Sequence, residues 1–164
     1  MKDWFKKKSN WLTIVIVAYV AWRQAPILLN SFQSQGTILE TKTYTTISPT
    51  KPFQVEFPSK ESKALAIFWA TWCGPCKVEM QRLKSSHIDQ SKIFAINPFE
   101  DAATSRKFLE TNDYQFTFID APEVTQRLKI ELTPTTLFIN KGEITSMSTG
   151  MSLIGIWKAQ WFLN

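Results

Sequence analysis

The sequence predicts an α/β domain with a central mixed β-sheet flanked by helices on both faces. Residues 64–69 ("ALAIFW") form a continuous apolar run, which is typical of a strand that is buried on both faces, and residues 92–97 ("KIFAIN") predict a second buried strand. A helical pattern follows each run, and the chain ends in a hairpin and a helix. A strand–helix–strand start with a strand–strand–helix end indicates a mixed sheet.

The other elements follow from local patterns. Residues 41–47 and 53–57 alternate apolar and polar side chains around a proline-bearing turn, which predicts an N-terminal β-hairpin. A short strand is expected at 114–119, and a hairpin at 133–150 turns at residues 140–143. Helices are expected from residue 74 or 75 to about 86, at 101–111 with Asp101 as its cap, at 122–129 and at 152–162.

The C-terminal helix carries aromatic side chains at helical spacing. Trp157 and Trp161 share one side of it with Leu153 and Ile154. This spacing suits a helix that packs on a sheet, so we expect both tryptophans in the core. The alternative is a face that contacts a membrane.

The net charge of +5 is concentrated at the N-terminus. Residues 1–30 hold four lysines and one arginine against a single aspartate, whereas the rest of the chain is nearly balanced. Because the basic charge belongs to the N-terminal segment, it does not indicate a nucleic-acid-binding domain.

Residues 1–29 predict a cytoplasmic basic head and a transmembrane anchor. The apolar run from Trp11 to Trp22, extended to residues 9–29, is long enough to cross about 30 Å of hydrocarbon. The lysines before it are expected to stay cytoplasmic, which sends the rest of the chain across the membrane. A cleaved signal peptide and a soluble helix are the alternatives, although no small-residue cleavage site follows the run.

The remaining residues divide into a linker and a domain. Residues 30–42 are polar and predict a tether, and residues 43–164 predict the folded domain. Under this topology the domain faces an oxidising compartment, where small exported domains often carry structural disulfides.

Both cysteines lie in one short motif, "WCGPC" at residues 72–76. Cys73 is expected at a helix N-terminus, where free N–H groups and the helix dipole favour a thiolate. Cys76, one turn further, can attack a mixed disulfide on Cys73. We therefore interpret Cys73 as the nucleophile and Cys76 as the resolving thiol, with their disulfide in place of a cofactor. A zinc half-site is the competing interpretation, but only His87 could join the two thiols and zinc needs four ligands.

With these elements in place, the chain resembles the thioredoxin superfamily. The resemblance rests on "FWATWCGPCKVE" (68–79), "ELTPTTLFINKGEI" (131–144) and the closing helix, and it covers residues 48–164. More narrowly, the chain is similar to the membrane-anchored TlpA-like thiol–disulfide oxidoreductases, which include the cytochrome c biogenesis thioredoxins and ScsD. This resemblance implies a thioredoxin-like fold with a redox-active Cys-x-x-Cys pair.

The resemblance also implies a substrate-binding loop. Pro134 would be a cis-proline that faces the disulfide, with Thr133 before it, and the backbone there would bind a substrate peptide as an extra strand. Trp72, Gly74 and Pro75 would contact the same substrate.

Two positions depart from the thioredoxin pattern. Ile67 stands where thioredoxins carry a buried aspartate, and Gln81 stands where they carry a helix-kinking proline. Glu79 matches the acidic residue that TlpA-like reductases carry after the motif, so it is the expected proton acceptor for Cys76. The alternative is an exposed Glu79 that pairs with Arg82, three residues further along the helix.

The Gly-Pro pair between the cysteines favours the reducing direction. It resembles thioredoxin, whose potential of about −270 mV lies far below the roughly −120 mV of the oxidant DsbA. We therefore expect a periplasmic dithiol reductase of exported proteins, tethered to the bacterial inner membrane and acting on apocytochromes or copper-protein thiols. The implied electron donor is a transmembrane thiol transporter of the DsbD or CcdA kind. An oxidase or isomerase of the same fold and a Cu(I)-binding dithiol protein are the alternatives.

Overall fold

The structure is a computed structural model that describes residues 2–152 and 155–164. Its elements confirm the predicted α/β class. In chain order they are α1 (Lys2–Ser34), β1 (Lys42–Thr45), β2 (Gln54–Phe57), β3 (Lys63–Phe68), α2 (Gly74–Lys84), the 3₁₀ turn η1 (Gln90–Lys92), β4 (Ile93–Ile96), α3 (Ala102–Glu110), β5 (Thr117–Ile119), α4 (Pro122–Arg127), β6 (Thr135–Asn140), β7 (Glu143–Thr149) and α5 (Gly155–Leu163).

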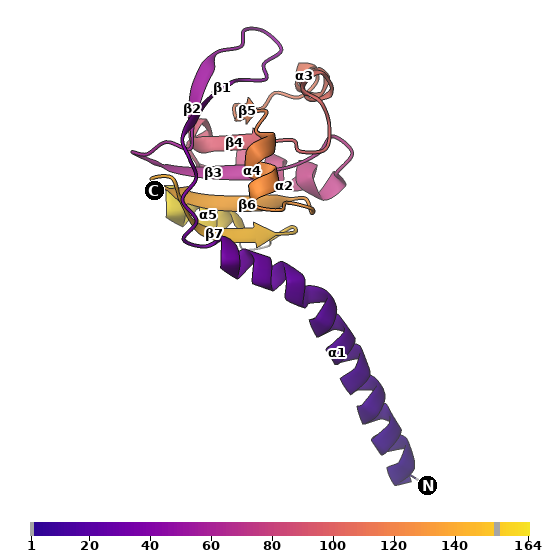
Figure 1. Cartoon of the computed structure of the whole chain (residues 1–164). Helices are drawn as coiled ribbons and strands as arrows, with labels where there is room; N and C mark the ends of the chain where they lie inside the picture. Colours follow the sequence, from indigo (N-terminus) through magenta and orange to yellow (C-terminus); the bar gives the residue numbers. More distant parts are fainter. Residues whose placement is uncertain (1, 153–154) are drawn as a thin grey trace.

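The central sheet is mixed, as predicted. Its strand order is β5-β4-β3-β6-β7 (Figure 1). The pairs β3–β4 and β4–β5 are parallel, whereas β3–β6 and β6–β7 are antiparallel. Since β3 is the central strand, the segment that follows it emerges from the middle of the sheet edge.

Each face of the sheet has its own apolar core. Leu65 and Ile67 of β3 belong to the core that α2, α3 and α5 cover. Ala66 and Phe68 point to the opposite core, which α4 and the β1–β2 hairpin cover. Successive residues of a strand point to opposite faces, so two buried faces explain why β3 is apolar from Ala64 to Phe68.

The predicted N-terminal hairpin forms a separate two-stranded sheet. β1 and β2 pair antiparallel, with Tyr44 opposite Val55. Phe57 of β2 is fully buried, and its ring centroid lies 4.7 Å from that of Phe94 on β4. The hairpin is therefore part of the core on the α4 face.

α1 extends away from the domain as one helix of 33 residues (Figure 1). The side chains of residues 11–22 are exposed along its whole circumference, including Trp11 and Trp22. The sequence predicts a transmembrane anchor at residues 1–29, but across the described residues no helix is both long and apolar enough to cross a membrane.

Part of the predicted linker at 30–42 is ordered against the sheet. α1 continues to Ser34, and Gly36 follows with a φ of 76°, the left-handed conformation that ends many helices. The N–H of Gly36 donates to the carbonyl of Ile144 at 2.8 Å, and the N–H of Ile144 donates to the carbonyl of Thr37 at 3.0 Å. This segment thus pairs with the edge of β7.

The prediction for the tryptophans of the C-terminal helix is wrong. Trp157 and Trp161 are 74% and 84% exposed, and Ala159 and Leu163 are the residues that α5 buries. Apolar residues occur on every side of this helix, so the spacing could not identify the buried side. The other two residues assigned to it, 153–154, lie outside the described residues.

Candidate active site

The two cysteines form a disulfide where β3 leads into α2. Cys73 is the N-cap of α2, and its Sγ accepts a hydrogen bond from the Cys76 N–H at 3.2 Å. Cys76 is fully buried and Cys73 is 5% exposed, while Gly74 and Pro75 between them are exposed. Pro75 fits the first turn of α2, where a missing N–H leaves no helical hydrogen bond unmade. A thiolate on Cys73 would be stabilised by the free N–H groups of this turn.

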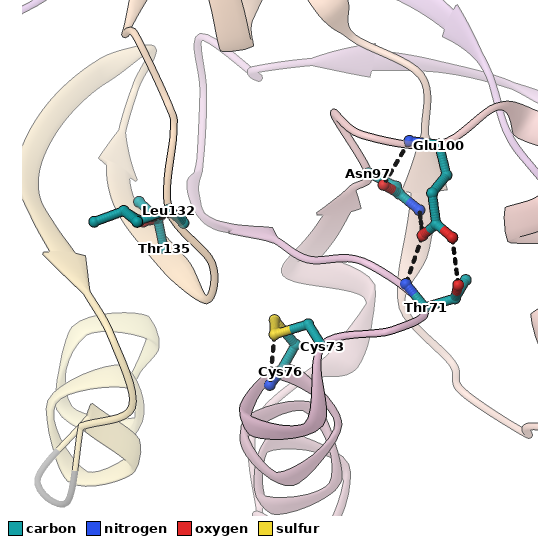
Figure 2. The surroundings of a disulfide bond; sticks show 7 residues. All are labelled: Thr71, Cys73, Cys76, Asn97, Glu100, Leu132 and Thr135. Atoms are coloured by element: carbon teal, nitrogen blue, oxygen red, sulfur yellow. Dashed lines mark hydrogen bonds between the residues drawn. A yellow bond between two sulfur atoms is a disulfide. The ribbon is translucent and has the colours of Figure 1, made fainter.

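The loop before β6 lies at the same end of the sheet. The Thr133–Pro134 peptide bond is cis, as the resemblance implies. β6 pairs with β3 so that Thr135 lies opposite Phe68, the last residue of β3. Thr135 closes this loop by donating from its hydroxyl to the carbonyl of Leu132 at 2.8 Å, and both residues lie in the surroundings of the disulfide (Figure 2).

Exposed apolar side chains gather around the motif. Trp72 is 66% exposed, and its ring centroid lies 5.8 Å from that of Phe99, which follows β4. Leu132 on the loop before β6 is also exposed. The sequence singled out Trp72, but Phe99 and Leu132 join it only through the fold.

Glu100 binds the segment that precedes the disulfide. Its carboxylate accepts a hydrogen bond from the N–H of Thr71 at 2.6 Å and another from the Thr71 hydroxyl (Figure 2). It also accepts from the Nδ2 of Asn97 at 2.8 Å. Burial alone would raise the pKa of Glu100, but the hydrogen bonds from Thr71 and Asn97 outweigh it, so the pKa lies below its ordinary value.

Asn97 orders the loop that carries Glu100. Its buried side chain accepts from the backbone N–H groups of Phe99 and Glu100 at 3.1 and 3.2 Å, and it donates to the hydroxyl of Ser105 at 3.2 Å. Sequence reasoning missed both residues. The available signal was their place after the buried strand β4, because the carboxyl ends of neighbouring parallel strands lie together at one sheet edge.

Glu79 has features of both alternatives that the sequence left open. It is 5% exposed on α2, and burial raises its pKa, although the nearby Arg82 guanidinium opposes that rise. The Nη1 of Arg82 lies 3.4 Å from the Glu79 carboxylate. Glu79 lines a cavity of about 130 Å³ between α2 and α5, and a Cβ on Gly155 would lie 3.1 Å from its Oε1. The close approach of α5 therefore encloses this carboxyl.

The two thiols are the groups of this site that can carry electrons. His87, the single histidine of the sequence, is exposed beyond the end of α2. Across residues 2–152 and 155–164, no three histidine, cysteine, aspartate or glutamate side chains gather in a way that could hold a metal ion.

Comparison with known proteins gives one family match. The model of the family described as Thioredoxin matches residues 44–154. A thioredoxin-like protein of Haemophilus influenzae is 28% identical over 103 residues, which cover 61% of this chain and 62% of that protein. The thioredoxin-like protein YneN of Bacillus subtilis is 34% identical over 101 residues, 56% of this chain and 59% of that protein. The chain thus spans about three fifths of the length of these curated relatives.

A solved structure shares the fold. The crystal structure of StoA from Bacillus subtilis superposes with a TM-score of 0.61 at 23% identity, over 76% of this chain and 97% of that one. This likeness confirms the predicted thioredoxin-like architecture. Together with the family match it confirms the superfamily resemblance.

Proposed function

The chain belongs to the thioredoxin family, and from this premise we propose that it is a protein thiol–disulfide oxidoreductase whose reagent is the Cys73–Cys76 pair. One observation carries the proposal. The disulfide lies at the N-terminus of α2, at the sheet end where the cis-Pro134 loop also lies. A helix N-terminus favours a reactive thiolate, and the backbone of a neighbouring loop can hold the polypeptide to be reduced.

The reaction proceeds by two exchanges of thiolate and disulfide. In the reduced protein the Cys73 thiolate attacks one sulfur of a substrate disulfide, and the other substrate sulfur leaves as a thiolate that takes up a proton. The Cys76 thiolate then attacks the Cys73 sulfur of the mixed disulfide. The second substrate thiol is released and the Cys73–Cys76 disulfide forms, so two electrons pass from the pair to the substrate.

Glu79 is the proposed proton acceptor for Cys76. It lies one helical turn beyond Cys76 on α2 and is buried beside Arg82. Because burial raises the pKa of Glu79, its carboxyl holds a proton at a higher pH than an ordinary glutamate and can exchange one with a thiol.

The substrate is proposed to bind across the exposed part of the motif. Gly74 and Pro75 are exposed beside Cys73, and Trp72 provides an apolar ring next to them. A peptide that pairs with the backbone at Thr133 would lie over these residues as an added strand. Extended, locally unfolded segments of proteins suit this mode of binding.

We propose that the reaction runs as a reduction in the periplasm of a bacterium. The apolar side chains of residues 11–22 are exposed, which supports attachment to the inner membrane through α1. An oxidising compartment would keep the pair oxidised, so electrons must come from a transmembrane thiol donor of the DsbD or CcdA kind. The substrates would be exported proteins with oxidised cysteines, such as apocytochromes or copper-site proteins.

A trapping experiment tests the exchange. In the full chain, Cys76→Ser should leave Cys73 able to attack substrates but unable to release them, so mixed disulfides should accumulate and disappear on addition of dithiothreitol. Cys73→Ser is the matched control and should trap no substrate. A protein that instead holds Cu(I) with its dithiol would trap nothing in either variant and would lose metal binding in both.

A further inference from the structure

The outer face of α5 carries two tryptophans that the domain does not bury. Trp161 and Trp157 have the highest exposures of the large apolar side chains in the described part of the chain. They are four residues apart, so they lie on one side of the helix, which we call the α5 tryptophan face. Neighbouring exposed aromatic side chains of this kind mark interaction sites more often than ordinary surface.

A basic and aromatic pocket adjoins this face. It has a volume of about 470 Å³ and is lined by Lys63, Thr145, Ser146, Lys158, Trp161 and Phe162. The lining includes two lysines and no carboxylate. The Nζ of Lys158 donates to the Ser146 hydroxyl at 2.8 Å and lies 4.3 Å from the centre of the Phe138 ring. This chemistry suits an anionic group that has apolar material next to it.

The pocket lies at the end of the sheet opposite the disulfide. β3 begins at Lys63, which lines the pocket, and ends at Phe68, four residues before the motif at residues 72–76. At about 3.3 Å per residue, the two ends of this strand are about 17 Å apart. A partner bound at the pocket would therefore leave the redox site uncovered.

α1 joins the domain at this same end. Gly36 and Thr37, which follow α1, are hydrogen-bonded to Ile144 of β7. Thr145 and Ser146, the next residues of β7, line the pocket. Figure 1 shows α1 leaving the domain beside β7. The point where α1 joins the domain and the pocket thus lie at the same end of the sheet.

We propose that the α5 tryptophan face and its pocket dock on the surface of a bilayer that contains anionic phospholipid. Tryptophan prefers the headgroup region, and lysines are attracted to anionic headgroups. Lys63 and Lys158 would lie toward lipid phosphates, with Trp157 and Trp161 between the headgroups. The inference rests on the attachment through α1 proposed above, and it orients Cys73 away from the membrane, toward its protein substrates.

A fluorescent probe on α5 tests the docking. The full chain would carry Cys73→Ser and Cys76→Ser, so that a polarity-sensitive probe can be placed on a single thiol at Gln160→Cys, beside both tryptophans. The matched control places the probe at Phe53→Cys, an exposed aromatic position by the β1–β2 hairpin. Both proteins would be reconstituted into phosphatidylcholine vesicles with and without phosphatidylglycerol.

Docking of α5 on the bilayer should change the fluorescence of the probe on α5 and not that of the control probe. We expect the probe at residue 160 to shift to the blue and to be quenched by spin-labelled lipid, more strongly with phosphatidylglycerol, while the probe at residue 53 does neither. Adding Trp157→Ala and Trp161→Ala should abolish the shift without changing the far-ultraviolet circular dichroism, because both side chains are exposed.

Three results would overturn the proposal, and each has a different meaning. A chain that floats with vesicles while the probe at residue 160 stays in water would show attachment through α1 without docking of α5. A chain that does not float at all would refute the membrane attachment as well. A shift that occurs equally in detergent without vesicles and grows with protein concentration would identify a second copy of the chain as the partner of this face.

Discussion

Replacing Glu100 by alanine removes the carboxylate that holds the segment before Cys73. The substitution deletes two hydrogen bonds from Thr71 and one from Asn97. Hydrogen bonds to a charged group contribute about 1.5–3 kcal/mol each, and at this half-buried position water can replace part of what is lost. We therefore expect Glu100→Ala to lower the free energy of unfolding by about 2–3 kcal/mol, and Glu100→Gln, which keeps one acceptor oxygen, by about half as much.

The local effect should be visible at one amide. With 1.4 kcal/mol for each factor of ten, the loss corresponds to exchange of the Thr71 amide hydrogen that is faster by on the order of 100-fold. Denaturant unfolding measures the global loss, and hydrogen exchange followed by NMR measures the local one. Glu110→Ala, an exposed carboxyl on α3, is the matched control and should change neither quantity.

The same variant has a defined pH dependence. Because the pKa of Glu100 in the folded protein lies below its ordinary value of 4.5, the stabilisation is complete above that pH. It should disappear as the pH falls through the lower, folded pKa, where wild type and Glu100→Ala should converge. If Glu100→Ala, like Glu110→Ala, changed neither the free energy of unfolding nor the exchange of the Thr71 amide at neutral pH, Glu100 would not hold the segment before Cys73.

Other substitutions test the core, the hairpin and the contact between α2 and α5. Trp69→Ala empties a fully buried position and should lower the free energy of unfolding by about 3–5 kcal/mol, so an unchanged denaturant midpoint would contradict its place in the core. Tyr44→Phe removes the 2.6 Å hydrogen bond to Glu123 and should lower stability by about 1–2 kcal/mol at neutral pH. Burial alone would raise the pKa of Glu123, but the Tyr44 hydrogen bond helps to hold it below 4.5. The Tyr44→Phe difference should therefore fade in acid titrations, and a constant difference would point to lost packing. Gly155→Ala places a methyl group 2.9 Å from the Cβ of Ser152 and 3.1 Å from the Glu79 carboxylate. It should lower stability by about 1–3 kcal/mol in thermal unfolding, whereas no loss would mean that these neighbours can move aside.

The parts of the fold that sequence predicts well are those with one dominant pattern. β3 and β4 are buried on both faces, so their runs from Ala64 and Ile93 are apolar throughout and easily recognised. The cap at Asp101 is equally local, since its carboxylate accepts from the Thr104 N–H three residues later at 2.7 Å. Motif and resemblance together predict the Cys73–Cys76 disulfide and the cis peptide bond before Pro134, and the structure contains both.

The parts that sequence does not predict depend on contacts between distant segments. Glu100 meets Thr71 only because β3 and β4 end at the same sheet edge, 29 residues apart in the chain. Glu79 is buried by α5, which the sequence reaches more than 70 residues later. On α2, apolar Val78 is exposed, because the sheet and α5 cover the side of the helix that carries Met80 and Leu83.

The reduction potential of the Cys73–Cys76 pair tests the central claim most directly. The full chain, in detergent, would be equilibrated with dithiothreitol or glutathione redox buffers, and the fraction of disulfide would be read after thiol alkylation. A dithiol reductase should have a potential near the roughly −270 mV of thioredoxin. A value near the roughly −180 mV of protein disulfide isomerase or the −120 mV of DsbA would contradict the reductase assignment and identify an isomerase or an oxidase.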